Sequence, residues 1–111
     1  MALRIASGFG AGMQMGETCG AVTGAFMVLG LQHATSECNV VKGRKPVYAA
    51  LAEFRKMFEV RNRTLVCRDL LGCDPTTPEG AQMAKERGLF KTTCLKMVRD
   101  AAEILDQMLG A

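Results

Sequence analysis

Apolar residues recur along the chain at the three- and four-residue spacings of amphipathic helices, and no run keeps the strict alternation of a half-buried strand. The clearest stripe follows Pro46, a residue tolerated in a first helical turn, and consists of Val47, Leu51, Phe54 and Phe58. A second stripe predicts a final helix over residues 94–109 and consists of Cys94, Val98, Ala101, Leu105 and Met108. The charged residues of that helix, Asp100 among them, are expected to face solvent.

Glycines divide the rest of the chain into shorter helical segments. Residues 1–7 have the pattern of the last turns of a helix, which the glycines at 8, 10 and 12 end. The next predicted helix covers residues 17–31. Gly16, Gly20 and Gly24 recur there every four residues, so that another backbone can approach closely.

Two short helices complete the pattern. The first covers residues 67–71 and ends at Gly72, and the second covers residues 79–87 and ends at Gly88. About five helices in 111 residues predict an all-α fold, a small helical bundle. The length is that of a single domain, residues 1–111.

Charge and composition argue against two classes of function. The net charge of +3 comes from 14 basic and 11 acidic residues, and no aromatic residues alternate with the basic run around Lys42, so we expect no nucleic-acid binding. The uncharged stretch over residues 18–34 contains polar residues and glycines and is too short to span a membrane. Residues 1–12 lack the pattern of a signal peptide, so we expect no membrane partner and a cytoplasmic location.

The five cysteines are the most informative residues. They cannot all pair within one chain, and a cytoplasmic location keeps thiols reduced, which favours metal binding or redox chemistry over a disulfide framework. Cys19, Cys67 and Cys94 each fall at the predicted start of a helix, the last after the expected N-cap pair Thr92-Thr93. The partial positive charge of a helix N-terminus lowers a thiol pKa and favours the thiolate, which attacks disulfides and binds metals.

The spacing of the cysteines does not select one chemistry. No pair forms a C-x-x-C motif, so neither a thioredoxin-like active site nor a zinc knuckle is indicated. If Cys19, Cys67 and Cys94 converge, their thiolates suit zinc, copper(I) or an iron–sulfur cluster, and a closed tetrahedral site needs a fourth ligand. His33, the only histidine, is expected to meet the last carbonyls of its helix rather than bind a metal.

Four motifs in order give the chain a family resemblance over essentially its whole length. They are Ala6-Ser7-Gly8-Phe9-Gly10, Cys19-Gly20-Ala21-Val22-Thr23-Gly24, Cys67-Arg68-Asp69-Leu70-Leu71-Gly72 and Cys94. The chain thereby resembles the C_GCAxxG_C_C family of redox-active proteins. The resemblance implies a small helical protein in which Cys19, Cys67 and Cys94 serve redox or metal chemistry. It also implies an iron–sulfur cluster as one candidate cofactor and an electron-transfer protein as a partner, because similar domains occur fused to electron-transfer modules.

The chain also departs from the family pattern. Members are longer at the N-terminus and carry a further cysteine on an upstream helix, so we expect that helix to be missing here. A four-cysteine site would then lack one ligand unless Cys38, Cys73, His33, water or a neighbouring subunit replaces it. Apolar surface left bare by the missing helix favours a homo-oligomer.

Two hypotheses follow for the function. In the first, the protein is a redox or metal-binding module, and if an enzyme then a thiol-based oxidoreductase. Its thiolates at Cys19, Cys67 and Cys94 either cycle between dithiol and disulfide or bind a soft metal. In the second, the protein is a non-catalytic helical interaction module whose cysteines are inert apolar residues. The two differ in thiol behaviour, because inert thiols react only on unfolding.

Overall fold

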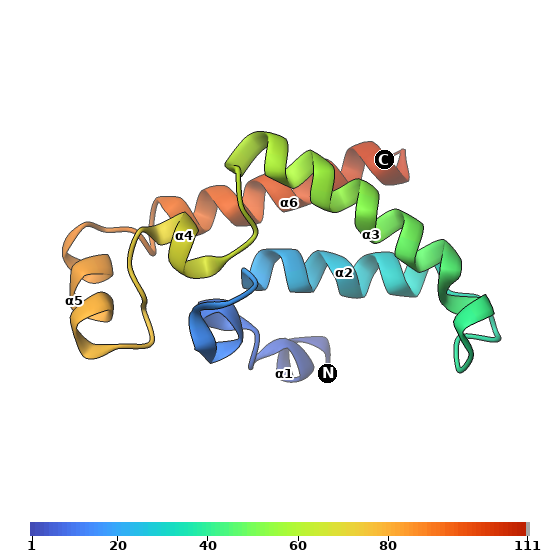
Figure 1. Cartoon of the computed structure of the whole chain (residues 1–111), viewed down its shortest axis with the longest axis horizontal. Coiled ribbons are helices and arrows are strands. Elements are labelled where there is room, and N and C mark those ends of the chain that lie inside the picture. Colours follow the sequence, from blue (N-terminus) through green and yellow to red (C-terminus); the bar gives the residue numbers. More distant parts are fainter. Residues whose placement is uncertain (111) are drawn as a thin grey trace.

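The computed structural model describes residues 1–110, and this part of the chain is all-α, as predicted. Three long helices, α2 (Gly20–His33), α3 (Val41–Asn62) and α6 (Thr93–Leu109), pack against one another in pairs. The shorter elements are α1 (Ala2–Ala6), a π-helical turn η1 (Gly12–Gly16), α4 (Cys67–Leu71) and α5 (Pro78–Glu86). Figure 1 shows α3 and α6 lying above α2 in this view. α5 lies at the end of the molecule opposite the α2–α3 loop.

The core lies between the three long helices. Its fully buried side chains include Val22 and Leu29 of α2, Phe54 and Phe58 of α3, and Ile104 of α6. The two phenylalanine rings stack with their centroids 5.9 Å apart. Burying a side chain of this size contributes roughly 1.5–3 kcal/mol, so these residues hold the bundle together. The stripe predicted after Pro46 is therefore confirmed at its two phenylalanines.

Two helices, α2 and α3, have boundaries that differ from the prediction by more than one residue. α3 begins at Val41, because a full turn forms before Pro46 and the proline removes only one N–H from the helix. α2 begins at Gly20, because Cys19 is still extended, with a ψ of 133°, and it ends at His33. The short helix predicted over residues 67–71 is confirmed, and Gly72 ends it with a φ of 73°.

The face predicted for the last helix is confirmed only in part. Ala101 is buried in the core, and Leu105 and Met108 pack against it as predicted. Val98 is 57% exposed, whereas Met97 and Ile104 are buried against the core. Asp100, expected in solvent, is buried and accepts hydrogen bonds from Lys96 Nζ (2.7 Å) and Asn62 Nδ2 (3.1 Å). Apolar residues cover more than one stripe of α6, so periodicity alone does not identify the stripe that faces inward.

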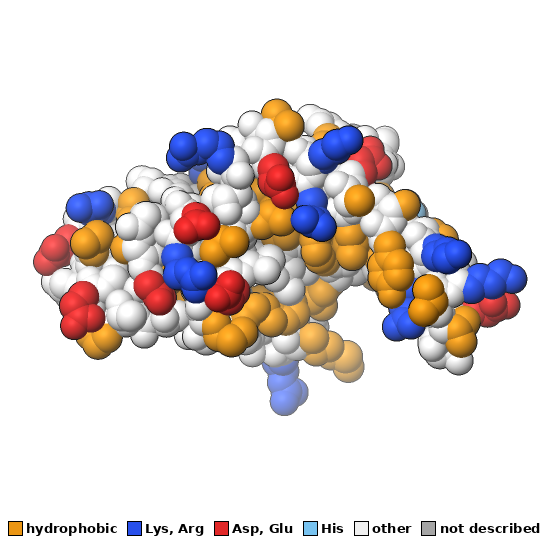
Figure 2. All heavy atoms as spheres, viewed as in Figure 1, with side chains coloured by type: hydrophobic (Ala, Val, Ile, Leu, Met, Phe, Trp, Pro, Cys, Tyr) orange, Lys and Arg blue, Asp and Glu red, His pale blue; other side chains and the backbone are white. Residues whose placement is uncertain are grey.

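The surface carries charges of both signs and scattered apolar side chains. On the face in Figure 2, acidic and basic side chains are intermixed, and hydrophobic side chains gather near its centre and lower edge. α1 buries no residue, and its Leu3 is 88% exposed. Among the described residues, none of the helices has the length and apolar character needed to cross a membrane.

Candidate thiol site

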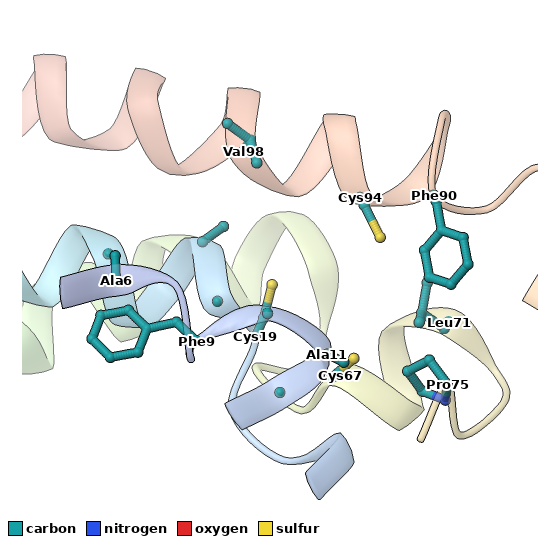
Figure 3. A pocket seen from close by; sticks show the side chains of 15 residues that line it. Ala6, Phe9, Ala11, Cys19, Cys67, Leu71, Pro75, Phe90, Cys94 and Val98 are labelled. Carbon is teal, nitrogen blue, oxygen red and sulfur yellow. The ribbon is translucent and has the colours of Figure 1, made fainter. Parts of the chain in front are cut away.

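The structure brings Cys19, Cys67 and Cys94 to the wall of one pocket of about 370 Å³ (Figure 3). Each comes from a different element: Cys19 caps the start of α2, Cys67 is the first residue of α4, and Cys94 is the second residue of α6. In Figure 3 the Cys94 side chain points down from α6 and the Cys19 side chain points up toward it. All three are free thiols. The prediction that they lie at helix starts is confirmed, although Thr92 makes no side-chain cap for α6.

A short antiparallel contact fixes Cys19 relative to Cys67. Thr18 and Val66 form an isolated β-bridge, and the Cys19 N–H donates to the carbonyl oxygen of Leu65 (2.8 Å). Each cysteine follows the bridged residue of its own segment, and the Cys67 N–H donates to the carbonyl oxygen of Glu17. The bridge therefore holds two thiols close together from positions 48 residues apart in the sequence.

Gly12 lies in close contact with Cys67. Its φ is +60°, and a Cβ added there would lie 2.7 Å from the Cβ of Cys67 and would overlap the backbone nitrogen of Glu17. Only glycine fits this position, both because of the left-handed backbone and because of the lack of space. The sequence predicts only that Gly12 helps to end a helix, and the contact of this residue with Cys67 has no signal in the sequence.

The three glycines of the predicted stripe have different surroundings. At Gly20 another backbone does approach, since an added Cβ would lie 2.9 Å from the carbonyl oxygen of Phe9. Gly16 lies before α2, and an added Cβ would meet the side chain of Arg68. Gly24 lines the pocket, and an added Cβ would meet no atom within 4 Å. The interpretation of close backbone packing is therefore right for Gly20 and wrong for Gly24.

Lowered thiol pKa values were expected, and for Cys67 and Cys94 this is wrong. Burial raises the pKa of Cys67 to about 11, with further contributions from Cys19 and Cys94. Burial, followed by the neighbouring Cys19, also raises the pKa of Cys94. The loss of water around the thiolate is the largest cause of both shifts. Both thiols are therefore protonated at neutral pH.

The remaining walls of the pocket are small or apolar. They are Ala6, Phe9, Gly10, Ala11, Gly12, Gly20, Ala21, Gly24, Leu71, Pro75, Phe90 and Val98. Most of these residues carry no chemical signal in the sequence, because the folding of separate segments creates the pocket. Within the described part of the chain, its lining contains no charged side chain.

The profile of one protein family, described as "Putative redox-active protein (C_GCAxxG_C_C)", matches residues 1–108. The chain belongs to the C_GCAxxG_C_C family. The match covers the three thiols and every wall of the pocket, and it supports a redox role in general terms. Comparison with curated proteins and with solved structures gives no match.

The arrangement of this family member does not fit the metal centre that the resemblance suggested. Across residues 1–110, no group of three or more His, Cys, Asp or Glu side chains is arranged to hold a metal ion. The thiols of Cys19, Cys67 and Cys94 thus share a pocket without forming a ligand set for zinc, copper(I) or an iron–sulfur cluster.

The candidate replacement ligands lie elsewhere. His33 is the last residue of α2, about 20 Å along the helix from Cys19. Cys38 is exposed in the loop after α2. Cys73 is half-buried and outside the pocket lining, although it is near enough to raise the pKa of Cys67 slightly.

Proposed function

We propose that this C_GCAxxG_C_C protein is a thiol-based redox module in which Cys19 and Cys67 cycle between two thiols and one disulfide. The observation that carries the proposal is the convergence of Cys19, Cys67 and Cys94 on one apolar pocket from three separate elements. Inert filler cysteines have no reason to meet in this way. The general redox role given by the family points in the same direction.

Cys19 is the central thiol of the three. It is the first of the neighbouring cysteines to raise the pKa of Cys67 and the only one to raise that of Cys94. It is also tied to Cys67 through the β-bridge between Thr18 and Val66. A disulfide requires the two Cα atoms to lie about 4.4–6.8 Å apart, so its formation needs the two segments to bring Cys19 and Cys67 within this range. Both cysteines are free thiols, so the structure represents the dithiol state.

The reaction conserves charge inside the pocket. Cys19 and Cys67 each lose one proton and one electron, an S–S bond forms, and an oxidised acceptor takes up two protons and two electrons. Both the dithiol and the disulfide are neutral, so an apolar pocket holds either state without the cost of burying a thiolate. Cys94 lies beside Cys19 and is the thiol that would exchange with the disulfide. Reduction by an electron-transfer protein in the cytoplasm would complete the cycle.

The test is oxidation of the reduced protein by diamide, a neutral diazene that becomes a hydrazine as two thiols become a disulfide. We expect the native protein to lose two hydrogen atoms, and peptide mapping to find Cys19 linked to Cys67. Cys19→Ala and Cys67→Ala should abolish this intramolecular product. Exposed Cys38 offers the matched control, because Cys38→Ala should leave the disulfide and its rate of formation unchanged.

Three results would overturn the proposal. The first is protein whose pocket thiols react only after denaturation, which would favour the inert module. The second is equal loss of the product in Cys38→Ala and Cys19→Ala. The third is stoichiometric zinc or iron in protein purified without oxygen, which would show that the thiols rearrange into a ligand set.

A further inference from the structure

The shape and polarity of the pocket indicate what the thiols reduce. Resting on the proposed function, we infer that the pocket binds a neutral, planar, apolar two-electron acceptor of the quinone class. Three features of the pocket, besides the thiols, support this acceptor. These are the lack of charge in its walls, two aromatic side chains that flank the cysteines, and a glycine in α2 that no packing contact requires.

The walls disfavour an anionic acceptor. Among the residues that the structure describes, no Lys, Arg or His lines the pocket. Arg68 follows Cys67 in the chain, but its side chain lies over Gly16 and pairs with Glu17 (2.9 Å). A carboxylate-bearing peptide disulfide would lose hydration in this pocket without gaining a cation in return. A neutral acceptor does not have this cost of losing the hydration of a charge.

The size and the aromatic walls favour a flat ring. A volume of about 370 Å³ lies within the range of roughly 300–1,000 Å³ typical of small-molecule sites. Phe9 and Phe90 both line the pocket, and Figure 3 shows them on opposite sides of the three cysteines, with the ring of Phe90 near Cys94. Offset or edge-on contacts with aromatic rings stabilise planar ligands.

Gly24 keeps the wall of α2 open. Glycine in a helix interior costs about 0.5–1 kcal/mol relative to alanine. No atom lies within 4 Å of a Cβ added at Gly24, so packing does not explain the residue. Access to the thiols explains the glycine, because any side chain at this position would occupy the pocket that Gly24 lines.

The reaction balances without a further co-reactant. The thiols of Cys19 and Cys67 each transfer one proton and one electron, and the two sulfurs join in a disulfide. The two carbonyl oxygens of the quinone each gain one proton and the ring gains two electrons, which gives the hydroquinone. Protonated thiols supply both the electrons and the protons, so the step leaves no charge in the pocket.

The experiment uses duroquinone, whose four methyl groups leave no free ring position for thiol addition. The reduced protein is mixed with duroquinone without oxygen, and hydroquinone formation is followed by absorbance. We expect one hydroquinone per protein, formed together with the Cys19–Cys67 disulfide. Oxidised glutathione, an anionic disulfide, should react more slowly at equal concentration.

Two glycines of α2 provide matched variants. An added Cβ meets no atom at either Gly24 or Gly30, but only Gly24 lines the pocket. Gly24→Leu should lower the rate of duroquinone reduction by about tenfold or more, since it blocks approach to the thiols. Gly30→Leu should react like the original protein. Phe90→Ala should raise the duroquinone concentration needed for half-maximal rate by about 2- to 10-fold, the value of an aromatic contact.

The controls separate this inference from the proposed function. If diamide forms the Cys19–Cys67 disulfide but duroquinone yields no hydroquinone, the quinone assignment is wrong and the redox module stands. A faster reaction with oxidised glutathione than with duroquinone would also overturn the assignment. So would equal rates for Gly24→Leu and Gly30→Leu. Failure of diamide itself would remove the proposed function, and the quinone inference with it.

Discussion

The long helices α2 and α6 each serve two regions of very different construction. Val22 and Leu29 of α2 and Ile104 of α6 fill a closed core, in which each of these side chains is fully buried. At the thiol pocket, α2 and its N-cap contribute Gly20, Gly24 and Cys19, and α6 contributes Cys94 and Val98. The core is filled by large side chains, whereas the pocket is kept hollow by small ones. Stability and chemistry are thus assigned to different faces of the same two helices.

The backbone differs between the regions as well. The core is made of regular helix, whereas the pocket is bordered by residues Ala11–Gln14, which all have φ values between 52° and 63°. A left-handed conformation costs roughly 1–2 kcal/mol for each residue other than glycine. Strain of this kind persists where surrounding contacts fix it, and here it sets Gly12 against Cys67. The strained backbone at the border of the pocket therefore lowers the stability of the fold.

The largest expected effect is a loss of stability in the core. Phe58→Ala removes a fully buried ring that stacks on Phe54, and it should lower the free energy of unfolding by about 3–5 kcal/mol. Phe90→Ala, at the pocket and 46% exposed, is the matched control and should cost far less. Urea unfolding followed by circular dichroism measures both. Equal losses would mean that the pocket contributes as much as the core to the stability of the fold.

Gly12→Ala should lower both the stability of the fold and the rate of disulfide formation at the pocket. The positive φ and the overlap with Cys67 and Glu17 together should cost about 2–4 kcal/mol of unfolding free energy. Because the added methyl group displaces Cys67, the rate of disulfide formation with diamide should fall as well. Gly8→Ala is the control, since an added Cβ there meets no atom within 4 Å. A Gly12→Ala protein with unchanged stability and oxidation rate would contradict the described contact.

Asp100→Asn tests the junction between α3 and α6. Burial raises the pKa of Asp100, but hydrogen bonds from Lys96 and Asn62 outweigh it, so the pKa lies below its ordinary value. The carboxylate thus stabilises the fold above the unfolded pKa of about 3.9, and this contribution is lost as the pH falls through the lower folded value. At pH 7 the variant should lose about 1–3 kcal/mol of unfolding free energy, because the amide group of asparagine places a donor against other donors.

The pH dependence of that loss provides the check. The difference between the two proteins in urea unfolding should shrink as the pH is lowered below about 4. Glu103→Gln is a suitable control, because Glu103 pairs with Arg61 (2.6 Å) at the exposed surface and such pairs contribute about 0–1 kcal/mol. A difference for Asp100→Asn that is constant down to pH 2 would show that its charge is not what stabilises the junction.

The two regions also differ in how far the sequence predicts them. Helix starts depend on local signals, which is why Cys19, Cys67 and Cys94 could be placed at three of them. The inward face of α6 could be predicted only in part, at Ala101, Leu105 and Met108. Its apolar residues cover more than one stripe, and Asp100 resembles a surface residue until its partners are known. The raised pKa of Cys67 depends on burial, which is a tertiary property.

The pocket itself had no signal in the sequence. Phe9, Pro75 and Phe90 come together only through folding, and nothing in their spacing relates them to a thiol. The β-bridge between Thr18 and Val66 is equally invisible, because one bridge leaves no alternating pattern. Cysteine positions could thus be predicted as candidates, whereas their common environment could not.

The smallest expected effect tests whether the pocket border is strained. Gln14 is exposed and has a φ of 59°, so Gln14→Gly should relieve strain and raise the free energy of unfolding by about 0.5–1 kcal/mol after the entropic cost of glycine. Gln32 is exposed within α2, and Gln32→Gly should lower the same quantity by about 0.5–1 kcal/mol. Opposite signs for one substitution at two exposed glutamines would show that the border is left-handed. If both variants are destabilised alike, the border is not left-handed, and the contact of Gly12 with Cys67 loses its structural basis.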